Sequence, residues 1–320
     1  MSSRKRALGM EVKVTDRCNQ ECPHCMNGDG RRPGRDLDWR LFNRRLEEWA
    51  GRRGDSVCDL REVRLTGGEP LVDIDAVLGI AECCRRLGLP VGINTNGLLL
   101  DPDRIRRLKQ VGIGVVKVSF DAIDAATYGL MRAPLPSLDP LVESIRTLAA
   151  EGFRVIMRFT LSRTNRDHLV PCRVLAGELG VHTFQIKPLI RSGRAVGLDT
   201  FLDAADINAA LGELARRCSG SRPVTEVLCW PPAAGLGFTH TVCGGVNKIY
   251  VAPSMAATTC NFIPGERRAQ LGDLASTPLE DLLRRRLERT WTEQVEGHSL
   301  LAGCPNAPGF RTSLGAAGCP

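Results

Sequence analysis

Strand-like and helix-like segments alternate regularly from Glu11 to Lys187. In one helical segment Leu78, Ala81 and Cys84 fall at helical spacing. Helices of this length between short apolar strands indicate repeated βα units with parallel strands. We expect strands over Glu11–Thr15, Glu62–Thr66, Val91–Thr95, Val115–Phe120, Arg154–Thr160 and Thr183–Lys187, and helices near Trp39–Arg53, Ile74–Leu87, Pro102–Val111, Pro140–Glu151 and Arg166–Leu179.

The predicted fold is α/β with two parts. Right-handed crossovers would curl the six βα units into a partial (β/α)6 barrel, which we assign to residues 1–195. In parallel sheets of this kind the chemistry lies at the C-terminal ends of the strands. Residues 196–320 contain Pro-, Gly- and Cys-rich stretches and predict a small second domain, whose thin apolar core metal ligation would support. Its elements are expected near Ala205–Cys218, Lys248–Ala252 and Leu279–Thr290.

Charge and hydropathy disfavour two classes of partner. The formal charge is +7, but the basic residues are scattered, and beyond the basic N-terminus only Arg284, Arg285 and Arg286 form a triplet. Nucleic-acid binders need a basic stripe, so solvated helix faces are the better interpretation. An anionic or phosphorylated substrate stays open. No apolar run approaches the roughly 20 residues of a membrane span, and no apolar segment follows the basic N-terminus, so we expect a cytoplasmic protein without a signal peptide.

The chain has thirteen cysteines, many more than a reduced protein needs for packing. Without a secretion signal a disulfide framework is not expected, so metal or cluster ligation is the better explanation. Two groups stand out: a tight triplet at Cys18, Cys22 and Cys25, and five late cysteines at Cys229, Cys243, Cys260, Cys304 and Cys319.

The triplet Cys18, Cys22 and Cys25 follows directly on the first expected strand. A [4Fe-4S] cluster is normally held by four thiolates, so three would leave one iron open to a small molecule. A zinc loop is the alternative, but zinc would need a fourth ligand. His24, next to Cys25, cannot easily turn to the same metal.

This cysteine spacing, placed after the first strand of a partial barrel, resembles the signature of the radical S-adenosylmethionine superfamily. The resemblance implies that Cys18, Cys22 and Cys25 hold a [4Fe-4S] cluster whose open iron binds S-adenosylmethionine (SAM). One electron then cleaves the sulfonium and yields a 5′-deoxyadenosyl radical, which abstracts a hydrogen atom from the substrate. An electron donor such as flavodoxin or ferredoxin is implied as a partner.

Polar residues at later strand ends fit the same resemblance. Gly67, Gly68 and Glu69 follow the second strand, where the family holds the amino group of SAM. Two glycines let backbone approach a ligand closely, and a carboxylate can accept from an ammonium. A plain turn is the alternative for this segment. Asn94, in the segment that ends the third strand, is either a cofactor contact or part of an Asx-type turn.

The fourth, fifth and sixth strands add further candidates for cofactor contact. Ser119 and Asp121 end the fourth strand, and similar segments in relatives meet the ribose or the methionine portion. Arg158 would point into the barrel, where the methionine carboxylate would satisfy its charge; a structural ion pair is the alternative. Gln185 and Lys187 share one face by the two-residue period and are candidates for cofactor or substrate contact.

The late cysteines resemble a second cluster site. Gly193–Ala195 leads out of the sixth strand as in superfamily members with an added SPASM or shorter twitch domain. The cysteine order is also similar, although Ser254–Ala256 stands where relatives have a glycine turn. One auxiliary [4Fe-4S] cluster needs four thiolates. The expected ligands are Cys243, Cys260, Cys304 and Cys319, with Cys229 in reserve. Two [4Fe-4S] clusters are therefore expected in all.

Two reaction outcomes follow from this arrangement. An electron passed from the substrate radical to the auxiliary cluster would complete a two-electron oxidation. A thiol that returns a hydrogen atom would instead give an epimer. Cys229 or Cys319 is the expected donor, because five late cysteines exceed four ligand positions. Both outcomes stay open.

The expected substrate is a small polar molecule of the sugar or aminocyclitol type in a biosynthetic pathway. Only ten residues precede Glu11, which leaves no room for the peptide-recognition domain of many peptide-modifying members. A peptide bound through a separate partner is the second hypothesis. A non-catalytic, metal-stabilised binding protein is the rival from a different class.

Overall fold

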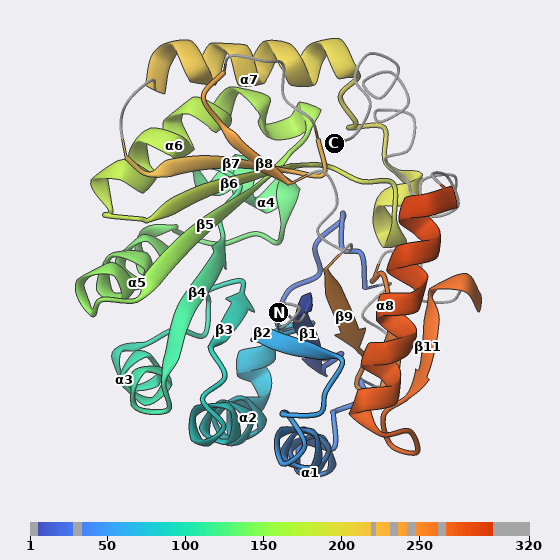
Figure 1. Ribbon diagram of the computed structural model, residues 1–320. Coiled ribbons are helices and arrows are strands. Elements are labelled where there is room, and N and C mark those ends of the chain that lie inside the picture. The colour runs from blue at the N-terminus through green and yellow to red at the C-terminus, as the bar shows by residue number, and fades with distance from the viewer. Residues whose placement is uncertain are drawn as a thin grey trace.

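The sheet of this protein runs through nearly the whole chain. The computed structural model describes residues 6–27, 34–218, 222–230, 236–241, 247–261 and 267–296. Within these ranges, eleven strands form one sheet in the order β11-β10-β9-β1-β2-β3-β4-β5-β6-β7-β8. Figure 1 shows the strands set in an arc, with helices α1, α2, α3, α5, α6 and α7 on its outer side.

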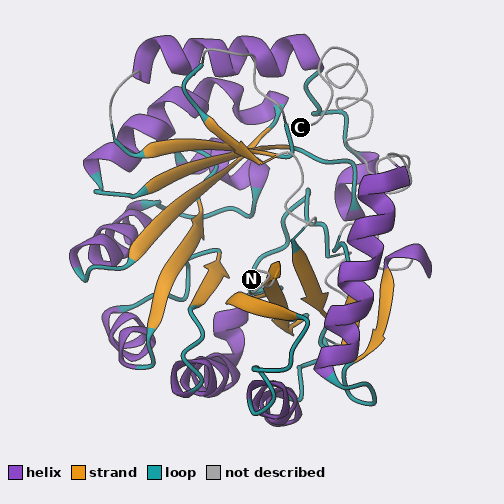
Figure 2. Cartoon of the chain, viewed as in Figure 1, coloured by secondary structure: helices purple, strands orange, loops and turns teal. Residues whose placement is uncertain are grey.

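The six expected strands are present and are parallel to one another in chain order. Figure 2 shows how helices and strands alternate along this half of the chain. The strands are β1 (Arg6–Thr15), β2 (Cys58–Gly67), β3 (Val91–Thr95), β4 (Ile113–Ser119), β5 (Arg154–Leu161) and β6 (Thr183–Pro188). The five expected helices are α1 (Trp39–Ala50), α2 (Ile74–Arg86), α3 (Pro102–Gln110), α5 (Asp139–Ala150) and α6 (Leu169–Glu178).

Local capping explains where several helices begin. Asp38, Asp73 and Asp101 precede α1, α2 and α3, and each side chain accepts a hydrogen bond from a backbone N–H of the first turn. Such bonds satisfy N–H groups that a helix leaves without an intrahelical partner. Asp124 caps α4 (Ala125–Met131) in the same way. This short helix, in the connection after β4, was not expected from the sequence.

The two faces of the sheet differ in polarity. On β5, Val155, Met157 and Phe159 are fully buried, whereas the intervening residues are half-buried. The apolar set packs in the main core, as the two-residue period requires. Arg158 therefore lies on the inner, concave face of the arc.

Residues after 195 continue the same sheet. Helix α7 (Ala204–Cys218) leads to β7 (Val224–Leu228) and β8 (Thr239–Thr241), both parallel to β6. Strand β9 (Lys248–Val251) is parallel to β1 and is followed by β10 (Ala256–Thr258), β11 (Gln270–Asp273) and α8 (Leu279–Glu296). The expected helices and the expected strand of this part are confirmed, and β7, β8, β10 and β11 were not foreseen.

The C-terminal segment shares the main core. Ile249, Val251, Leu271 and Leu282 are buried in the same apolar cluster as the side chains of β1 and β2. This packing results from the pairing of β9 with the free edge of β1. The division at residue 195 stays a prediction, since strands from both sides of it belong to one sheet. Across the described ranges, every helix is too short or too polar to cross a bilayer.

Candidate active site

The cysteine loop leaves β1 at Thr15 and is braced by two other segments. The Asn27 amide donates to the Gly67 carbonyl at 2.8 Å, and the Arg194 N–H donates to the Cys25 carbonyl at 2.9 Å. Gly193 has a left-handed φ of 59°, and a Cβ there would lie 2.5 Å from the Cys25 oxygen. The Gly193–Ala195 turn after β6 therefore packs directly against the loop.

Gly67 and Gly68 allow a close approach of two backbones. A Cβ on Gly67 would lie 2.5 Å from the Thr15 oxygen, and one on Gly68 would lie 2.2 Å from the Arg17 oxygen. The Gly68 and Glu69 N–H groups donate to the carbonyls of Thr15 and Arg17, each at 2.8 Å. The glycines thus position the start of the cysteine loop, and their contact with SAM stays a prediction.

Glu69 is enclosed, and its carboxylate ties its own segment after β2 to the end of β3. It accepts from the Thr95 hydroxyl at 2.8 Å, the Asn96 N–H at 2.7 Å and the Leu71 N–H at 3.1 Å. Burial raises the pKa of Glu69 to about 7, and the Asn96, Thr95 and Leu71 donors oppose that rise. The Asn96 amide in turn donates to Asn19 of the cysteine loop at 2.7 Å.

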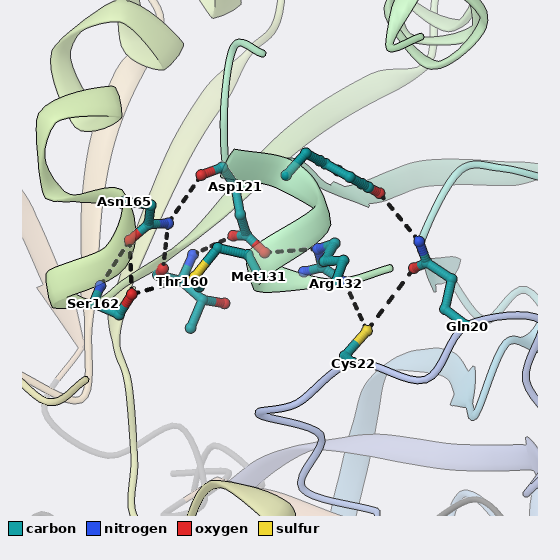
Figure 3. A network of polar contacts seen from close by, with 9 residues as sticks. Gln20, Cys22, Asp121, Met131, Arg132, Thr160, Ser162 and Asn165 are labelled. Carbon is teal, nitrogen blue, oxygen red and sulfur yellow. Dashed lines mark hydrogen bonds and ion pairs between the residues drawn. The ribbon is translucent and has the colours of Figure 1, made fainter. Parts of the chain in front are cut away.

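Asp121 lies at the centre of a buried polar network (Figure 3). Its carboxylate accepts from Arg132 Nε and from the Thr160 N–H, both at 2.6 Å. Its carbonyl accepts from the Asn165 amide at 2.9 Å. Both carboxylate oxygens are engaged, so Asp121 holds Arg132 in place; a contact with the ribose stays a prediction.

Arg132 connects this network to the cysteine loop. Its Nη1 lies 4.0 Å from the Cys22 sulfur, and the Cys22 thiol lies 4.0 Å from the Gln20 amide oxygen. Burial raises the pKa of Cys22, while the guanidinium of Arg132 lowers it. Burial likewise raises the pKa of Cys18 to about 11, against a hydrogen bond from the Gln20 N–H. A cation beside Cys22 favours the thiolate, the form that binds metal.

The donor set fits an iron–sulfur cluster better than one metal ion. Among the described residues, no three His, Cys, Asp or Glu side chains are arranged to hold a single ion. In a cubane each thiolate binds a different iron, so the sulfurs surround a larger body. As whole residues, Cys18 is exposed and Cys22 and Cys25 are half-buried. Neighbouring atoms nevertheless enclose the Cys18 and Cys22 sulfurs enough to raise their pKa. Burial lowers the pKa of His24 to about 4, which keeps its ring neutral beside the loop.

The other expected cofactor residues lie on the inner face of the arc. Ser119 ends β4 beside Arg158 of β5, which pairs in register with Gln185 of β6. The Gln185 amide donates to Glu226 at 2.7 Å. Asn94 is also on this face, and its amide oxygen is buried without a hydrogen-bond partner. The fold brings these residues onto one surface, and their contact with a cofactor stays a prediction.

Two of the five late cysteines lie in the described ranges. Cys229 follows β7 with a left-handed φ of 56°, and Cys260 follows β10; both are half-buried. Both raise the pKa of Lys187, which burial and Arg158 lower to about 8, so both lie within electrostatic reach of the inner face. Cys243, Cys304 and Cys319 lie outside the described residues.

Most of the remaining cysteines are packing residues. Cys58, Cys83, Cys84 and Cys172 are fully buried. Cys218, at the end of α7, is half-buried. Every cysteine in the described ranges is a free thiol.

Sequence comparisons identify the family. The radical SAM superfamily model matches residues 12–170. A GTP 3′,8-cyclase from Pelotomaculum thermopropionicum is 30% identical over 273 residues, which cover 79% of this chain and 81% of that protein. The chain belongs to the radical SAM superfamily. A pre-heme d1 synthase from Dinoroseobacter shibae is 27% identical, over 57% of this chain and 43% of that protein.

Solved structures show that the fold is that of the superfamily. Streptococcus suis SuiB bound to S-adenosylmethionine aligns with a TM-score of 0.71 and 12% identity, over 95% of this chain and 72% of that one. Native anSMEcpe with bound AdoMet aligns with a TM-score of 0.68 and 15% identity, over 93% and 88%. At these identities the likeness concerns the fold alone.

The network around the cysteine loop contains residues that the sequence did not single out. Arg132, Gln20, Thr95, Asn96 and Asn165 are polar and buried. Arg132 is 110 positions from Cys22. Only the packing of α4 against the strand ends brings the two together, so no local pattern indicated the contact.

Proposed function

We propose that this protein cleaves SAM reductively at a [4Fe-4S] cluster held by Cys18, Cys22 and Cys25 and abstracts a hydrogen atom from its substrate. The observation that carries the proposal is the braced loop of three free thiols, with the Arg132 guanidinium beside Cys22. When bound, the cluster and SAM supply a 5′-deoxyadenosyl radical.

The residues of this chain supply position and charge in that reaction. Asp121 holds Arg132 beside the cluster ligand Cys22, and Glu69 holds the ends of β2 and β3 together. The strand ends would then contact SAM through Gly67, Gly68, Glu69, Asn94, Ser119 and Asp121 and through Arg158, Gln185 and Lys187. The curved parallel sheet would act as a partial barrel that shields the reacting groups from water.

The proposal includes a twitch-type auxiliary cluster held by Cys243, Cys260, Cys304 and Cys319, with Cys229 in reserve. Its support is the position of Cys260 and Cys229, which both influence Lys187 on the inner face. An electron donor such as flavodoxin or ferredoxin would reduce the first cluster. The two outcomes differ in the last step. In oxidation the substrate radical would give up an electron, whereas in epimerisation it would receive a hydrogen atom.

The proposed substrate is a small polar molecule. The cyclase relatives are named for GTP, which is small and polar. A sugar or aminocyclitol finds no counterpart among the relatives described above. A structure of SuiB was determined with a precursor peptide, but 12% identity carries only the fold.

Iron content and SAM cleavage test the proposal together. Anaerobically reconstituted protein should hold about eight irons per chain, since each cubane carries about four. It should release 5′-deoxyadenosine when SAM and a reductant are added. Joint replacement of Cys18, Cys22 and Cys25 by alanine should leave about four irons and abolish release. Cys83→Ala, which removes a packing thiol of α2, is the matched control and should change neither. Full iron content or continued release in the triple variant would contradict the proposal.

Product mass in deuterated water separates the two outcomes. Oxidation gives a product about two mass units lighter, because the substrate loses two electrons and two protons overall. Epimerisation by a thiol gives one carbon-bound deuterium, because the thiol proton exchanges with solvent. In that case Cys229→Ala or Cys319→Ala should keep both clusters and still release 5′-deoxyadenosine, yet form no epimer. A lighter product without carbon-bound deuterium would exclude epimerisation.

A further inference from the structure

Cationic side chains line the inner face of the sheet on five strands. On β2 and β4 the flanking residues Val63, Leu65, Val116 and Val118 are fully buried toward the helices. The two-residue period therefore places Arg64 and Lys117 on the opposite, inner face. By the same reasoning Arg158 of β5, Lys187 of β6 and Lys248 of β9 also lie on this face.

Two of these cations make no direct ion pair with the residues that the structure describes. Arg64 pairs with Glu62 at 2.6 Å, and Lys248 pairs with Glu11 at 3.6 Å. The side chains of Lys117 and Arg158 make no hydrogen bond or ion pair within the described part of the chain. An enclosed cation without a partner is costly, and an anion would offset that cost.

Unsatisfied polar atoms gather on the same face. Arg64 is only 8% exposed, yet its Nη1 has no hydrogen-bond partner. The guanidinium lies over Gly92, where a Cβ would come within 2.8 Å of Nη1. The Asn94 and Gln185 amide oxygens are also buried without a partner. A polar molecule on this face would satisfy donors and acceptors that the protein leaves unpaired.

The cations also influence one another. Burial lowers the pKa of Lys117 well below its ordinary value, and Arg158, Arg64 and Lys248 lower it further, while Glu11 opposes them. These four residues therefore lie within electrostatic reach of the Lys117 ammonium. Positive charge concentrated in a low-dielectric interior favours an anionic ligand.

We propose that the inner face of the sheet binds an anionic group of the substrate, a phosphate or a carboxylate, through Lys117 and Arg64. The proposal rests on the proposed function, in which Arg158 is assigned to the SAM carboxylate. Lys117 lies two residues before Ser119, the last residue of β4, and Arg64 lies three residues before Gly67, the last residue of β2. Both are thus set back from the strand ends where SAM is expected.

Calorimetric titration of the full-length, anaerobically reconstituted protein tests this site. Saturating SAM is present, so that Arg158 is occupied, and ionic strength is held constant. The probes are pyrophosphate and, in a separate series, malonate. We expect saturable binding of at least one probe, and the tighter probe identifies the group as phosphate or carboxylate. Lys117→Met should weaken that binding by about tenfold or more, which corresponds to ~1.4 kcal/mol.

Two further variants make the result specific to the inner face. Arg64→Met should weaken the same probe to a similar degree, which keeps the test decisive if one variant folds poorly. Lys109→Met removes an exposed ammonium that pairs with Glu151 on the outer surface, and it should bind the probe as the wild type does. Absence of saturable binding by the wild type would overturn the proposal. So would wild-type affinity for the probe in both inner-face variants.

The release of 5′-deoxyadenosine is measured on the same samples. Release without probe binding would refute the anion site and leave the proposed function standing. Probe binding that depends on Lys117, in a protein that never cleaves SAM, would refute the proposed function and leave the anion site standing.

Discussion

Replacing Arg132 by methionine should remove the charge that neutralises Asp121 in the interior. The Asp121 side chain is fully buried, the Arg132 side chain is 9% exposed, and the two join through a 2.6 Å contact between Nε and Oδ2. In Arg132→Met the carboxylate would keep only the Thr160 N–H as a partner. Breaking a buried ion pair from one side costs about 3–5 kcal/mol of the free energy of unfolding.

Urea denaturation of the reduced, cluster-free protein, followed by circular dichroism, measures this loss. The control is Arg106→Met, which breaks the exposed pair of Arg106 with Asp103 on α3. Exposed pairs are worth about 0–1 kcal/mol, so this variant should unfold close to the wild type. The double variant Asp121→Asn, Arg132→Met removes both charges and keeps an acceptor for the Thr160 N–H. It should recover part of the lost stability.

A loss in Arg132→Met no larger than that in Arg106→Met would refute the reasoning. The reasoning would also fail if the double variant lost as much stability as the single variants Asp121→Asn and Arg132→Met lose together. Contacting residues normally show a coupling free energy, which makes the double loss smaller than that sum. Either result would mean that the Asp121–Arg132 pair does not stabilise the fold around the cysteine loop.

Three further predictions concern the same region. The pKa of Glu69 in the folded protein, about 7, lies above its ordinary value of 4.5. Between these two pH values, Glu69 is therefore protonated in the folded state but ionised in the unfolded state. The free energy of unfolding of the wild type, relative to that of Glu69→Gln, should therefore fall by about 3 kcal/mol as the pH rises from 4.5 to above 7. Urea titrations of the cluster-free proteins at several pH values measure this difference, and a difference that stays constant with pH would contradict the prediction. Gly193→Ala should destabilise the fold by about 1–3 kcal/mol and lower iron retention, since its Cβ would collide with the Cys25 carbonyl. Gly152→Ala, with a similar φ of 80° and no neighbour within 4 Å, should retain iron normally, and equal retention in both variants would argue against the contact. Finally, reconstituted Arg132→Met should have a more negative cluster midpoint potential in a redox titration followed by EPR, because a cation beside a ligand favours the reduced state; an unchanged potential would contradict this.

The local features of this protein could be predicted from its sequence. Buried parallel strands are short apolar runs and the helices between them have a helical period, so the βα alternation up to Lys187 could be predicted within a few residues at most ends. The candidate cluster ligands Cys18, Cys22 and Cys25 lie within one loop, so their spacing alone indicated the site. The strand and helix patterns and the cysteine spacing both involve residues that are close together in the sequence.

The features that depend on distant segments were decided by the tertiary structure. The pairing of β9 with β1 joins residues more than two hundred positions apart, and short strands such as β8 have too few residues for a periodic signal. The contact of Arg132 with Cys22 and the hydrogen bonds from Thr95 and Asn96 to Glu69 exist only because several strand ends meet at one edge of the sheet. The two-residue period indicates which residues share a face, but only the tertiary arrangement of the strands places Lys117 within electrostatic reach of Arg158, Arg64 and Lys248. Long-range contacts of this kind follow from the packing of the whole chain, which no local pattern encodes.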